Sequence, residues 1–330
     1  MYSIKIQSGK AFRANAGETL LSAALRANVS LAYSCRSGRC STCKCRVLHG
    51  ETKAQQDELG LSQRERDAGW VLSCVREPLT DVELIAEDLG DLALPPVKTL
   101  ACRIQSLQLL TPDVLKVVLR LPPKSVFRFH AGQYIEVMGE GGVRRSYSIA
   151  NAMNESQLLE LHIKRVPGGA MSHYWFEKAK ENDLLRLNGP LGTFVVRHVA
   201  GKDLVFLATG TGIAPVKAML ESIHALNPEQ MPRSVSVYWG GRVACDLYWQ
   251  PPSEYVWVQF KPVLSREPDF AGRKGYVQHA FLSEHVDLAQ TVIYACGSSE
   301  MIGAAQEVLS HAGLPDSSFY ADAFVCSGVE

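Results

Sequence analysis

The stretch 35-CRSGRCSTCKC-45 decides how the first part of the chain folds, because it holds four of the nine cysteines. Its spacing is Cys35-x4-Cys40-x2-Cys43, and Cys74 follows far downstream. A plant-type 2Fe–2S cluster uses this pattern of three close cysteines and a distant fourth. Small residues between the cysteines let the loop wrap closely and aim backbone N–H groups at the inorganic sulfides. The spacing therefore predicts that these four thiolates bind a 2Fe–2S cluster.

A structural zinc site is the alternative, because zinc also binds four cysteinates. Zinc sites usually pair two short Cys-x2–4-Cys units, whereas Cys74 stands alone. Cys45 lies two residues beyond Cys43 on a strand expected over 44–50, where it should face the other side as a buried thiol. Exchanging Cys45 for Cys43 is the main way in which the ligand assignment could be wrong in detail.

The segments around this loop predict a small β-grasp domain. Alternating apolar residues indicate strands, and the spacing after Gly17-Glu18-Thr19 indicates an amphipathic helix. The expected elements are strands over 2–7, 10–14, 70–74 and 81–86 and a helix over 20–28. The run 88-DLGDLALPPVK-98 has two prolines and no periodicity, as in an interdomain linker.

Length and composition limit the remaining possibilities. The 330 residues suffice for two or three domains, and 34 Lys and Arg balance 34 Asp and Glu. This balance argues against binding to nucleic acid or a membrane surface through bulk charge. No apolar run reaches the roughly 18–20 residues of a spanning helix, and residues 1–17 do not have the pattern of a secretory signal. Nine cysteines in such a chain favour a reducing compartment, so we expect a cytoplasmic protein.

From about residue 199 the sequence alternates strands and helices. The apolar run 204-LVFLAT-209 leads through a glycine turn into a helix, which is where a dinucleotide pyrophosphate binds. A lone Gly-x-Gly is weak, because tight strand–helix turns also need glycine, but the strand before it and the helix after it strengthen the prediction. Further strands are expected over 236–241 and 292–297. The candidate nucleotide-binding residues of the turn and helix are Gly210, Thr211, Gly212 and Pro215.

In this order the motifs resemble the ferredoxin–NADP reductase superfamily, in the members that carry an N-terminal plant-type ferredoxin domain. The resemblance is carried by 33-YSCRSGRCSTC-43, 145-RSYS-148 and 210-GTGIAP-215 and covers essentially the whole chain. It implies a multidomain α+β and α/β protein. The implied parts are a β-grasp ferredoxin domain (1–90), a linker (91–99), an antiparallel six-stranded FAD-binding β-barrel (100–198) and a parallel α/β NAD(P)-binding domain (199–330).

The resemblance assigns FAD to the barrel through the signature Arg145-Ser146-Tyr147-Ser148. An arginine can neutralise the FAD pyrophosphate, the tyrosine ring packs on the isoalloxazine, and Ser148 can bond near N5, which accepts hydride. Alone, the four residues would be typical of an ordinary strand. Further candidates lie on a strand over 162–165 and at the start of the next helix, whose N–H groups suit a phosphate. They are His162, Lys164, Gly169, Met171 and Ser172.

Further candidates concern the nicotinamide. In the family a Cys-Gly pair, here Cys296-Gly297, sits beside the nicotinamide ring, and Met301 is on the next helix. Cys296 can also be an ordinary buried thiol. The aromatic Phe324 matches a residue that covers the flavin face, although it can instead close the core. The candidate catalytic residues are Ser148, Cys296 and Phe324.

The preferred nucleotide is less sharply indicated. An acidic residue at the end of the second strand of such a domain favours NADH by bonding the ribose hydroxyls. Here that region reads 238-YWGGR-242, with no adjacent acid. Arg242 could meet a 2′-phosphate, but related NADH users also have arginine there. We expect NADH, with NADPH possible.

Electron counting predicts the function. NAD(P)H gives two electrons as one hydride, a 2Fe–2S cluster accepts one, and FAD exchanges either number. A plant-type cluster lies near roughly −400 mV and can therefore drive a strongly reducing or metal-containing partner. No second substrate pocket or acid–base pair stands out in the sequence. We therefore expect an electron-transfer reductase whose partner protein carries out the chemistry.

Two families of such reductases share this domain order. One serves a PMP/2Fe–2S dehydrase of deoxysugar synthesis, and the runs 143–151, 294–298 and 322–325 look closer to it. The other serves a Rieske ferredoxin or aromatic-ring oxygenase or a di-iron monooxygenase, and the cluster loop looks closer to the naphthalene type. We favour the dehydrase. A direct reductase of oxygen or small quinones is a further alternative, favoured if removing residues 1–90 left turnover intact.

Overall fold

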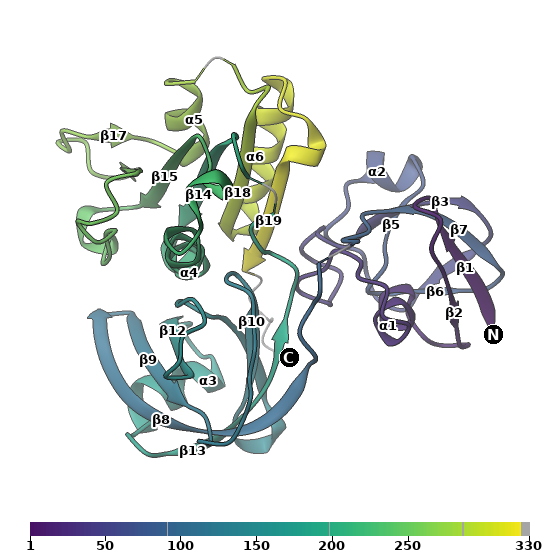
Figure 1. Cartoon of the computed structure of the whole chain (residues 1–330), viewed down its shortest axis with the longest axis horizontal. Helices are drawn as coiled ribbons and strands as arrows, with labels where there is room; N and C mark the ends of the chain where they lie inside the picture. Colours follow the sequence, from purple (N-terminus) through teal and green to yellow (C-terminus); the bar gives the residue numbers. More distant parts are fainter. Residues whose placement is uncertain (91, 198, 286, 325–330) are drawn as a thin grey trace. The chain divides into compact units, whose positions relative to one another are not determined.

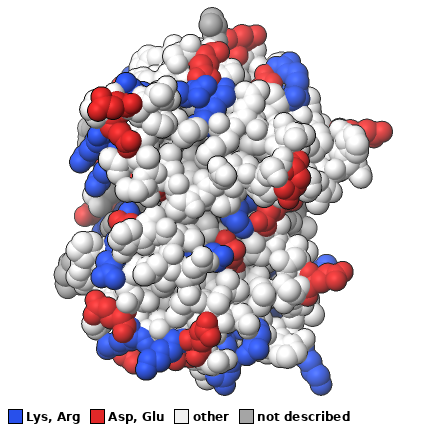
Figure 2. All heavy atoms as spheres, turned by 90° about the vertical axis from the view of Figure 1, so that its left-hand side faces the viewer, with Lys and Arg blue, Asp and Glu red and all other residues white. Residues whose placement is uncertain are grey.

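The computed structural model describes residues 1–90, 92–197, 199–285 and 287–324 (Figure 1). Residues Met1–Leu94 form one compact unit, with which 322–324 are grouped, and Pro95–Ala321 form a second. Among the described residues, no helix is long and apolar enough to cross a membrane. On the face shown in Figure 2, basic and acidic side chains are interspersed, as the balanced composition predicts.

The first unit is a mixed five-stranded sheet with one helix packed on it. The sheet has the order β2-β1-β7-β3-β5, in which β1 pairs antiparallel with β2 and parallel with β7. Its strands are β1 (Tyr2–Ile6), β2 (Ala11–Ala14), β3 (Lys44–His49), β5 (Trp70–Leu72) and β7 (Val82–Ala86), and β4 (Thr52–Ala54) pairs with β6 (Arg76–Pro78). The predicted β-grasp fold is confirmed.

Helix α1 (Leu20–Arg26) begins where the sequence predicts. The Thr19 side chain accepts a hydrogen bond from the backbone N–H of Ser22 and so caps the helix start. Its apolar stripe, which includes Leu20 and Leu21, is buried in the core of the unit. A second short helix, α2 (Gln63–Asp67), begins at Ser62 with a capping box. Helix α1 precedes the loop with Cys35, Cys40 and Cys43, and α2 precedes the strand that leads to Cys74.

The second unit starts with an antiparallel six-stranded sheet of order β11-β10-β13-β8-β9-β12. The strands are β8 (Lys98–Thr111), β9 (Val114–Arg120), β10 (Tyr134–Met138), β11 (Arg144–Ser148), β12 (Leu158–Lys164) and β13 (Leu184–Leu191). Figure 1 shows that these strands curve, and a bridge between Ile149 and Leu161 joins the chain after β11 to β12. The alternating inward residues of β9 and β12 fill the core. The predicted antiparallel barrel is confirmed.

The rest of the second unit is a six-stranded α/β sheet of order β17-β16-β15-β14-β18-β19. The strands are β14 (Asp203–Thr209), β15 (Ser234–Gly241), β16 (Val258–Leu264), β17 (Arg273–Lys274), β18 (Thr291–Ser298) and β19 (Phe319–Phe324), and the helices are α4 (Ile213–His224), α5 (Val277–Leu282) and α6 (Ser299–His311). Pairing from β17 through to β18 is parallel. The order continues from β14 to β15 on one side and jumps to β18 on the other, which creates a switch point where ligands bind such sheets.

Two local expectations need correction. Strands β16 and β17 were not predicted, although β16 is an inner strand of the sheet. The helix expected after the strand over 162–165 is only one turn long, as α3 (Ala170–His173), and then continues as a π-helical turn over Tyr174–Lys178. The buried Trp175 lies in that turn and packs into the barrel core, so a widened turn accommodates it.

Candidate functional site

The four predicted cluster thiols lie together in the first unit. Cys35, Cys40 and Cys43 are in the loop between α1 and β3, and Cys74 directly follows β5. The strongest interactions among them are between Cys35 and Cys40 and between Cys43 and Cys74. The bond from Cys40 outweighs burial and lowers the pKa of Cys35 to about 5, and the bond from Cys43 likewise lowers the pKa of Cys74. Cys35 is thus predisposed to be a thiolate, the form that binds iron, and the shift at Cys74 is in the same direction.

This pairing fits a two-iron cluster. In a four-cysteine 2Fe–2S site each iron takes two thiolates, whereas zinc gathers all four ligands around one point. In the described part of the chain, no group of three or more His, Cys, Asp or Glu side chains is arranged to hold a metal ion. The preference for the cluster therefore rests on the two thiol pairs and on the amides around them.

Backbone N–H groups of the loop point at the sulfurs. Ser37 donates to the Cys35 sulfur over 3.4 Å, and Cys35 donates to the Cys40 sulfur over 3.3 Å. The amide of Gly38 donates to Cys74. Such donors stabilise the extra negative charge of a reduced cluster. The residues present therefore fit the predicted group.

The loop is held by close backbone approach to the segment 57–60. A Cβ on Gly38 would lie 2.5 Å from the carbonyl oxygen of Asp57, and Gly38 has φ +74°. A Cβ on Gly60 would lie 2.9 Å from the Ser41 nitrogen. The Ser41 hydroxyl also donates to the Gly60 carbonyl. Only glycine allows the two segments to approach this closely.

Cys45 is separate from the four thiols. It lies on β3 opposite Val71 and Ala86, and 1% of its surface is exposed. Burial raises the pKa of its thiol to about 12, and the nearby Glu58 carboxylate adds to the shift. Cys45 is therefore a buried neutral thiol, as its position two residues after Cys43 predicts.

A buried ion pair that the sequence did not reveal braces the strand before Cys74. Glu58 accepts from the Leu72 backbone N–H over 2.6 Å and pairs with Arg76 over 2.7 Å. The Glu58 side chain is 4% exposed and that of Arg76 is 21% exposed. Glu58 lies in the segment 57–60, which packs against the cluster loop, and its contacts link this segment to Leu72 before Cys74 and to Arg76 after it. No local motif marks Glu58, because its partners are 14 and 18 residues away.

The flavin signature forms strand β11. Alternation places Arg145 and Tyr147 on one face and Ser146 and Ser148 on the other. The Tyr147 hydroxyl accepts from the Trp175 indole over 2.9 Å, and the two rings meet edge-on. Burial raises the pKa of Tyr147 to about 12, so this hydroxyl keeps its proton. The structure thus shows how Tyr147 is held, and its contact with FAD stays a prediction.

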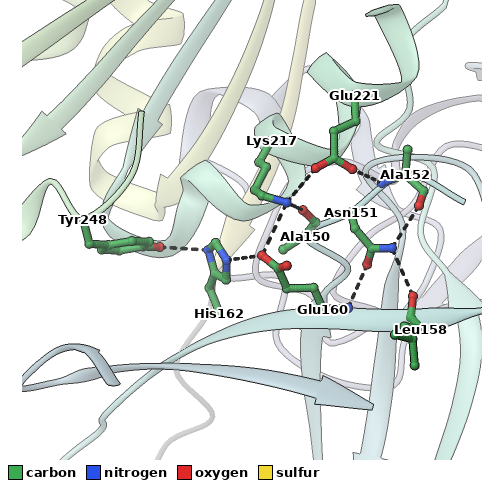
Figure 3. Close-up of polar contacts among 9 residues, drawn as sticks. All are labelled: Ala150, Asn151, Ala152, Leu158, Glu160, His162, Lys217, Glu221 and Tyr248. Carbon is green, nitrogen blue, oxygen red and sulfur yellow. Dashed lines mark hydrogen bonds and ion pairs between the residues drawn. The ribbon is translucent and has the colours of Figure 1, made fainter. Parts of the chain in front are cut away.

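The other flavin candidates are held by several different contacts. Lys164 pairs with Asp113 over 2.5 Å near the surface. His162 is turned into a buried contact with Tyr248 and Glu160 (Figure 3). The remaining three are at the start of α3: Gly169 is its N-cap, Met171 is buried beside Gly139, and Ser172 accepts from the Val166 backbone N–H over 2.8 Å. No contact among the described residues joins all five at one point, so their shared role in FAD binding stays a prediction.

The nucleotide candidates do come together at the switch point. Gly210 to Gly212 form a tight turn between β14 and α4, and Pro215 is buried in the first turn of α4. A Cβ on Gly212 would lie 2.2 Å from the Cys296 carbonyl oxygen. On Gly297 it would lie 2.1 Å from the Thr209 hydroxyl and 3.1 Å from the Met301 methyl group. The glycine turn after β14 and the end of β18 are therefore packed closely against each other.

Two acids missing from the sequence prediction lie around Arg242. Asp246 accepts from the backbone N–H of Arg242 over 2.7 Å and from that of Val243 over 3.2 Å. Glu267 accepts from the backbone N–H of Ala244 over 2.7 Å. The sequence has no acidic residue directly next to the end of β15, as stated above. The chain turns after this strand, however, and brings the carboxylates of Asp246 and Glu267 back to residues 242–244.

Phe324 is the last described residue and ends β19. Its side chain is partly exposed. Its role over the flavin stays a prediction.

A chain that combines this cluster loop with an antiparallel barrel and a dinucleotide-type switch point belongs to the class of iron–sulfur flavin reductases. Three domain families match it in order: the 2Fe-2S iron-sulfur cluster binding domain over 4–79, the oxidoreductase FAD-binding domain over 101–196 and the oxidoreductase NAD-binding domain over 206–307.

Relatives match along nearly the whole chain. The chain is 36% identical over 325 residues to the CDP-6-deoxy-L-threo-D-glycero-4-hexulose-3-dehydrase reductase of Yersinia pestis, with 97% of each protein covered. It is 31% identical over 330 residues to reductase component 1 of terephthalate 1,2-dioxygenase from Comamonas sp., covering 96% of this chain and 95% of the relative. The crystal structure of the Amycolatopsis cytochrome P450 reductase GcoB superposes with a TM-score of 0.78 at 32% identity, covering 98% and 99% of the two chains.

The chain therefore belongs to the ferredoxin–NADP reductase-like family whose members carry an N-terminal 2Fe–2S ferredoxin domain. The resemblance inferred from the motifs is confirmed. The protein is an NAD(P)H-dependent FAD and 2Fe–2S oxidoreductase that transfers electrons to a partner.

Proposed function

We propose that the electron acceptor is the dehydrase of a CDP-4-keto-6-deoxyglucose-3-dehydrase system, which makes deoxysugars in the cytoplasm. The observation that carries this proposal is the 36% identity, along 97% of both chains, to a reductase named for such a dehydrase. The terephthalate dioxygenase reductase component matches over a similar length at 31%. The runs 143–151 and 294–298 favour the same choice.

A second acceptor class is an oxygenase. The GcoB structure, described as a cytochrome P450 reductase, matches nearly the whole fold at 32% identity, and terephthalate 1,2-dioxygenase supplies another relative. The cluster loop also looks like that of naphthalene-type oxygenase reductases. A Rieske or di-iron oxygenase component is therefore the alternative partner. Direct reduction of oxygen or quinones is a weaker alternative, because it gives the cluster loop no role.

The residues divide the work among three sites. Cys35, Cys40, Cys43 and Cys74 would hold the cluster through the two thiol pairs. Arg145 would bind the FAD pyrophosphate by its forked guanidinium, and Ser148 would orient the flavin edge. The turn at Gly210 to Gly212 would receive the NADH pyrophosphate, and the small Cys296-Gly297 pair would let the nicotinamide approach the flavin. When bound, FAD converts the two-electron hydride donation of NADH into single-electron transfers.

We also propose that NADH is preferred over NADPH. The carboxylates of Asp246 and Glu267 lie beside the end of β15, where the adenosine ribose binds in such domains. Negative charge there opposes a 2′-phosphate, although Arg242 is close enough to moderate the effect. Titrating the protein with each nucleotide while recording flavin reduction measures this preference directly.

The partner is tested by reconstitution. The purified reductase with NADH is combined either with a PMP-dependent 2Fe–2S dehydrase and its CDP-sugar substrate or with a Rieske oxygenase component and an aromatic substrate. The proposal predicts efficient turnover of the sugar and slow reduction of the Rieske centre. Efficient reduction of the Rieske centre without sugar turnover would reject the dehydrase assignment and support the oxygenase alternative.

A further inference from the structure

A partly buried set of polar contacts joins the flavin barrel to the nucleotide-binding part within the second unit (Figure 3). On the barrel side, the His162 side chain on β12 is 2% exposed. Its Nε2 lies 2.8 Å from Glu160, and its Nδ1 lies 3.2 Å from the Tyr248 hydroxyl. Burial lowers the pKa of His162, so the ring is neutral near pH 7. The consistent arrangement is Tyr248 donating to Nδ1 while Nε2–H donates to the carboxylate.

The same carboxylate reaches helix α4. Lys217 lies 3.4 Å from Glu160 and 2.6 Å from Glu221, and it donates to the Ala150 carbonyl over 3.0 Å. Glu221 in turn accepts from the Ala152 backbone N–H over 2.7 Å. The Lys217 side chain is only 16% exposed. Helix α4 is thus tied to the backbone that directly follows the flavin signature strand.

These contacts also lead to the glycine turn. The Tyr248 ring stands edge-on to Trp239 with centroids 5.1 Å apart, and the Trp239 indole donates to the Gly210 carbonyl over 3.0 Å. The turn is therefore held from two directions, by Trp239 and by α4, which begins directly after it at Ile213. Glu160 and His162 lie in the FAD-binding match, whereas Lys217, Glu221 and Tyr248 lie in the NAD-binding match.

Hydride transfer needs the nicotinamide and flavin atoms about 3–3.5 Å apart, and a misplacement of about 1 Å can cost roughly 100-fold in rate. We propose that Glu160, His162, Lys217, Glu221 and Tyr248 are positioning residues, which set helix α4 and the glycine turn against the flavin strand and so fix the approach of nicotinamide to flavin. The proposal rests on FAD in the barrel and the nucleotide at the turn, and it does not depend on which protein accepts the electrons.

The chain contains a matched control. In the nucleotide-binding part alone, Glu284 accepts from Lys261 over 2.8 Å and from the Tyr238 hydroxyl over 2.9 Å, and it also pairs with Arg273. Glu284 and Glu221 have similar exposure, at 28% and 30%. The control set thus has the same chemistry but does not reach the barrel. Glu221→Gln and Glu284→Gln are isosteric, and each places an amide opposite a lysine.

The experiment follows flavin reduction by NADH in anaerobic stopped flow, with no acceptor protein, in holoenzyme of verified FAD and iron content. Glu221→Gln is expected to lower the limiting rate about tenfold or more, with the NADH Kd changed less than about threefold. Its nicotinamide–flavin charge-transfer absorbance should weaken, and the Ala152 amide should exchange hydrogen faster. Tyr248→Phe, which keeps the ring against Trp239, is expected to lower the rate about threefold.

The control variant Glu284→Gln should lower thermal stability and leave the limiting rate within about twofold of the wild type. Equal slowing by Glu284→Gln and Glu221→Gln would overturn the proposal, because general destabilisation would then explain both. Unchanged limiting rates in both Glu221→Gln and Tyr248→Phe would also overturn it. Should Glu221→Gln fail to fold, the rate and charge-transfer absorbance of Tyr248→Phe decide the question in the same way.

Discussion

Replacing Gly212 by alanine tests the packing at the switch point. Gly212 has φ −59° and ψ −14°, which suit any residue, so only space opposes the new methyl group. That methyl would lie 2.2 Å from the Cys296 carbonyl oxygen, about 0.8 Å inside the closest contact that a Cβ makes. Both partners are backbone, so the turn and the end of β18 must separate by about that distance. Overpacking of this kind costs about 1–3 kcal/mol of stability.

The separation falls between the proposed pyrophosphate and nicotinamide positions. At a loss of roughly 100-fold per 1 Å of misplacement, the limiting rate of flavin reduction by NADH should fall about 30-fold or more. FAD and iron content should stay unchanged, because neither the barrel nor the cluster loop is altered. Anaerobic stopped flow measures the rate, and urea unfolding measures the stability.

Gly303→Ala is the matched control, because this glycine lies inside α6 with no atom within 4 Å of the new Cβ. It should leave the rate unchanged and stabilise the protein by up to about 1 kcal/mol. A Gly212→Ala protein with normal stability would refute the close approach. A destabilised protein with a normal rate would instead refute the location of the nucleotide site.

Three further changes probe the other sites. Arg76→Met leaves the buried Glu58 carboxylate without its cation and should lower the stability of the ferredoxin part by about 2–3 kcal/mol, read from loss of visible circular dichroism in urea. Cys43→Ala should abolish the cluster spectrum and cytochrome c reduction while NADH still reduces the flavin. Cys45→Ala should retain the cluster spectrum and cytochrome c reduction, and the reverse result for the two variants would show that Cys45, not Cys43, binds the cluster. Asp246→Ala should narrow the preference for NADH over NADPH roughly tenfold in kcat/KM, or about 1.4 kcal/mol, and an unchanged ratio would exclude its role.

The features that the sequence predicts well are local. The cysteine spacing, the Thr19 helix start and the strand–turn–helix at Gly210 each depend on residues within a few positions of one another. Strand β16 was missed because Lys261 and Pro262 interrupt its apolar run. Lys261 is nevertheless buried, since Glu284 and Tyr238 satisfy its charge.

The features that the sequence could not predict join distant segments. Tyr248 is 86 residues from His162, and Glu221 is 69 residues from Ala152. Each of these side chains alone fits an ordinary surface or core position, so no local pattern marks the set. Asp246 was missed for a different reason, because a turn returns its carboxylate to the end of the strand.

The close approach at Gly38 has a consequence for how such reductases diversify. A side chain there is opposed twice, by φ +74° and by the Asp57 carbonyl 2.5 Å from its Cβ. The neighbouring Arg36 is exposed but has φ +58°, so its charge can be changed only by residues that tolerate this conformation, such as asparagine. The backbone of the loop thus fixes the sulfur positions, whereas its exposed side chains set the surface charge beside them. New docking partners can therefore be acquired by substituting exposed loop residues while the sulfur positions stay constant.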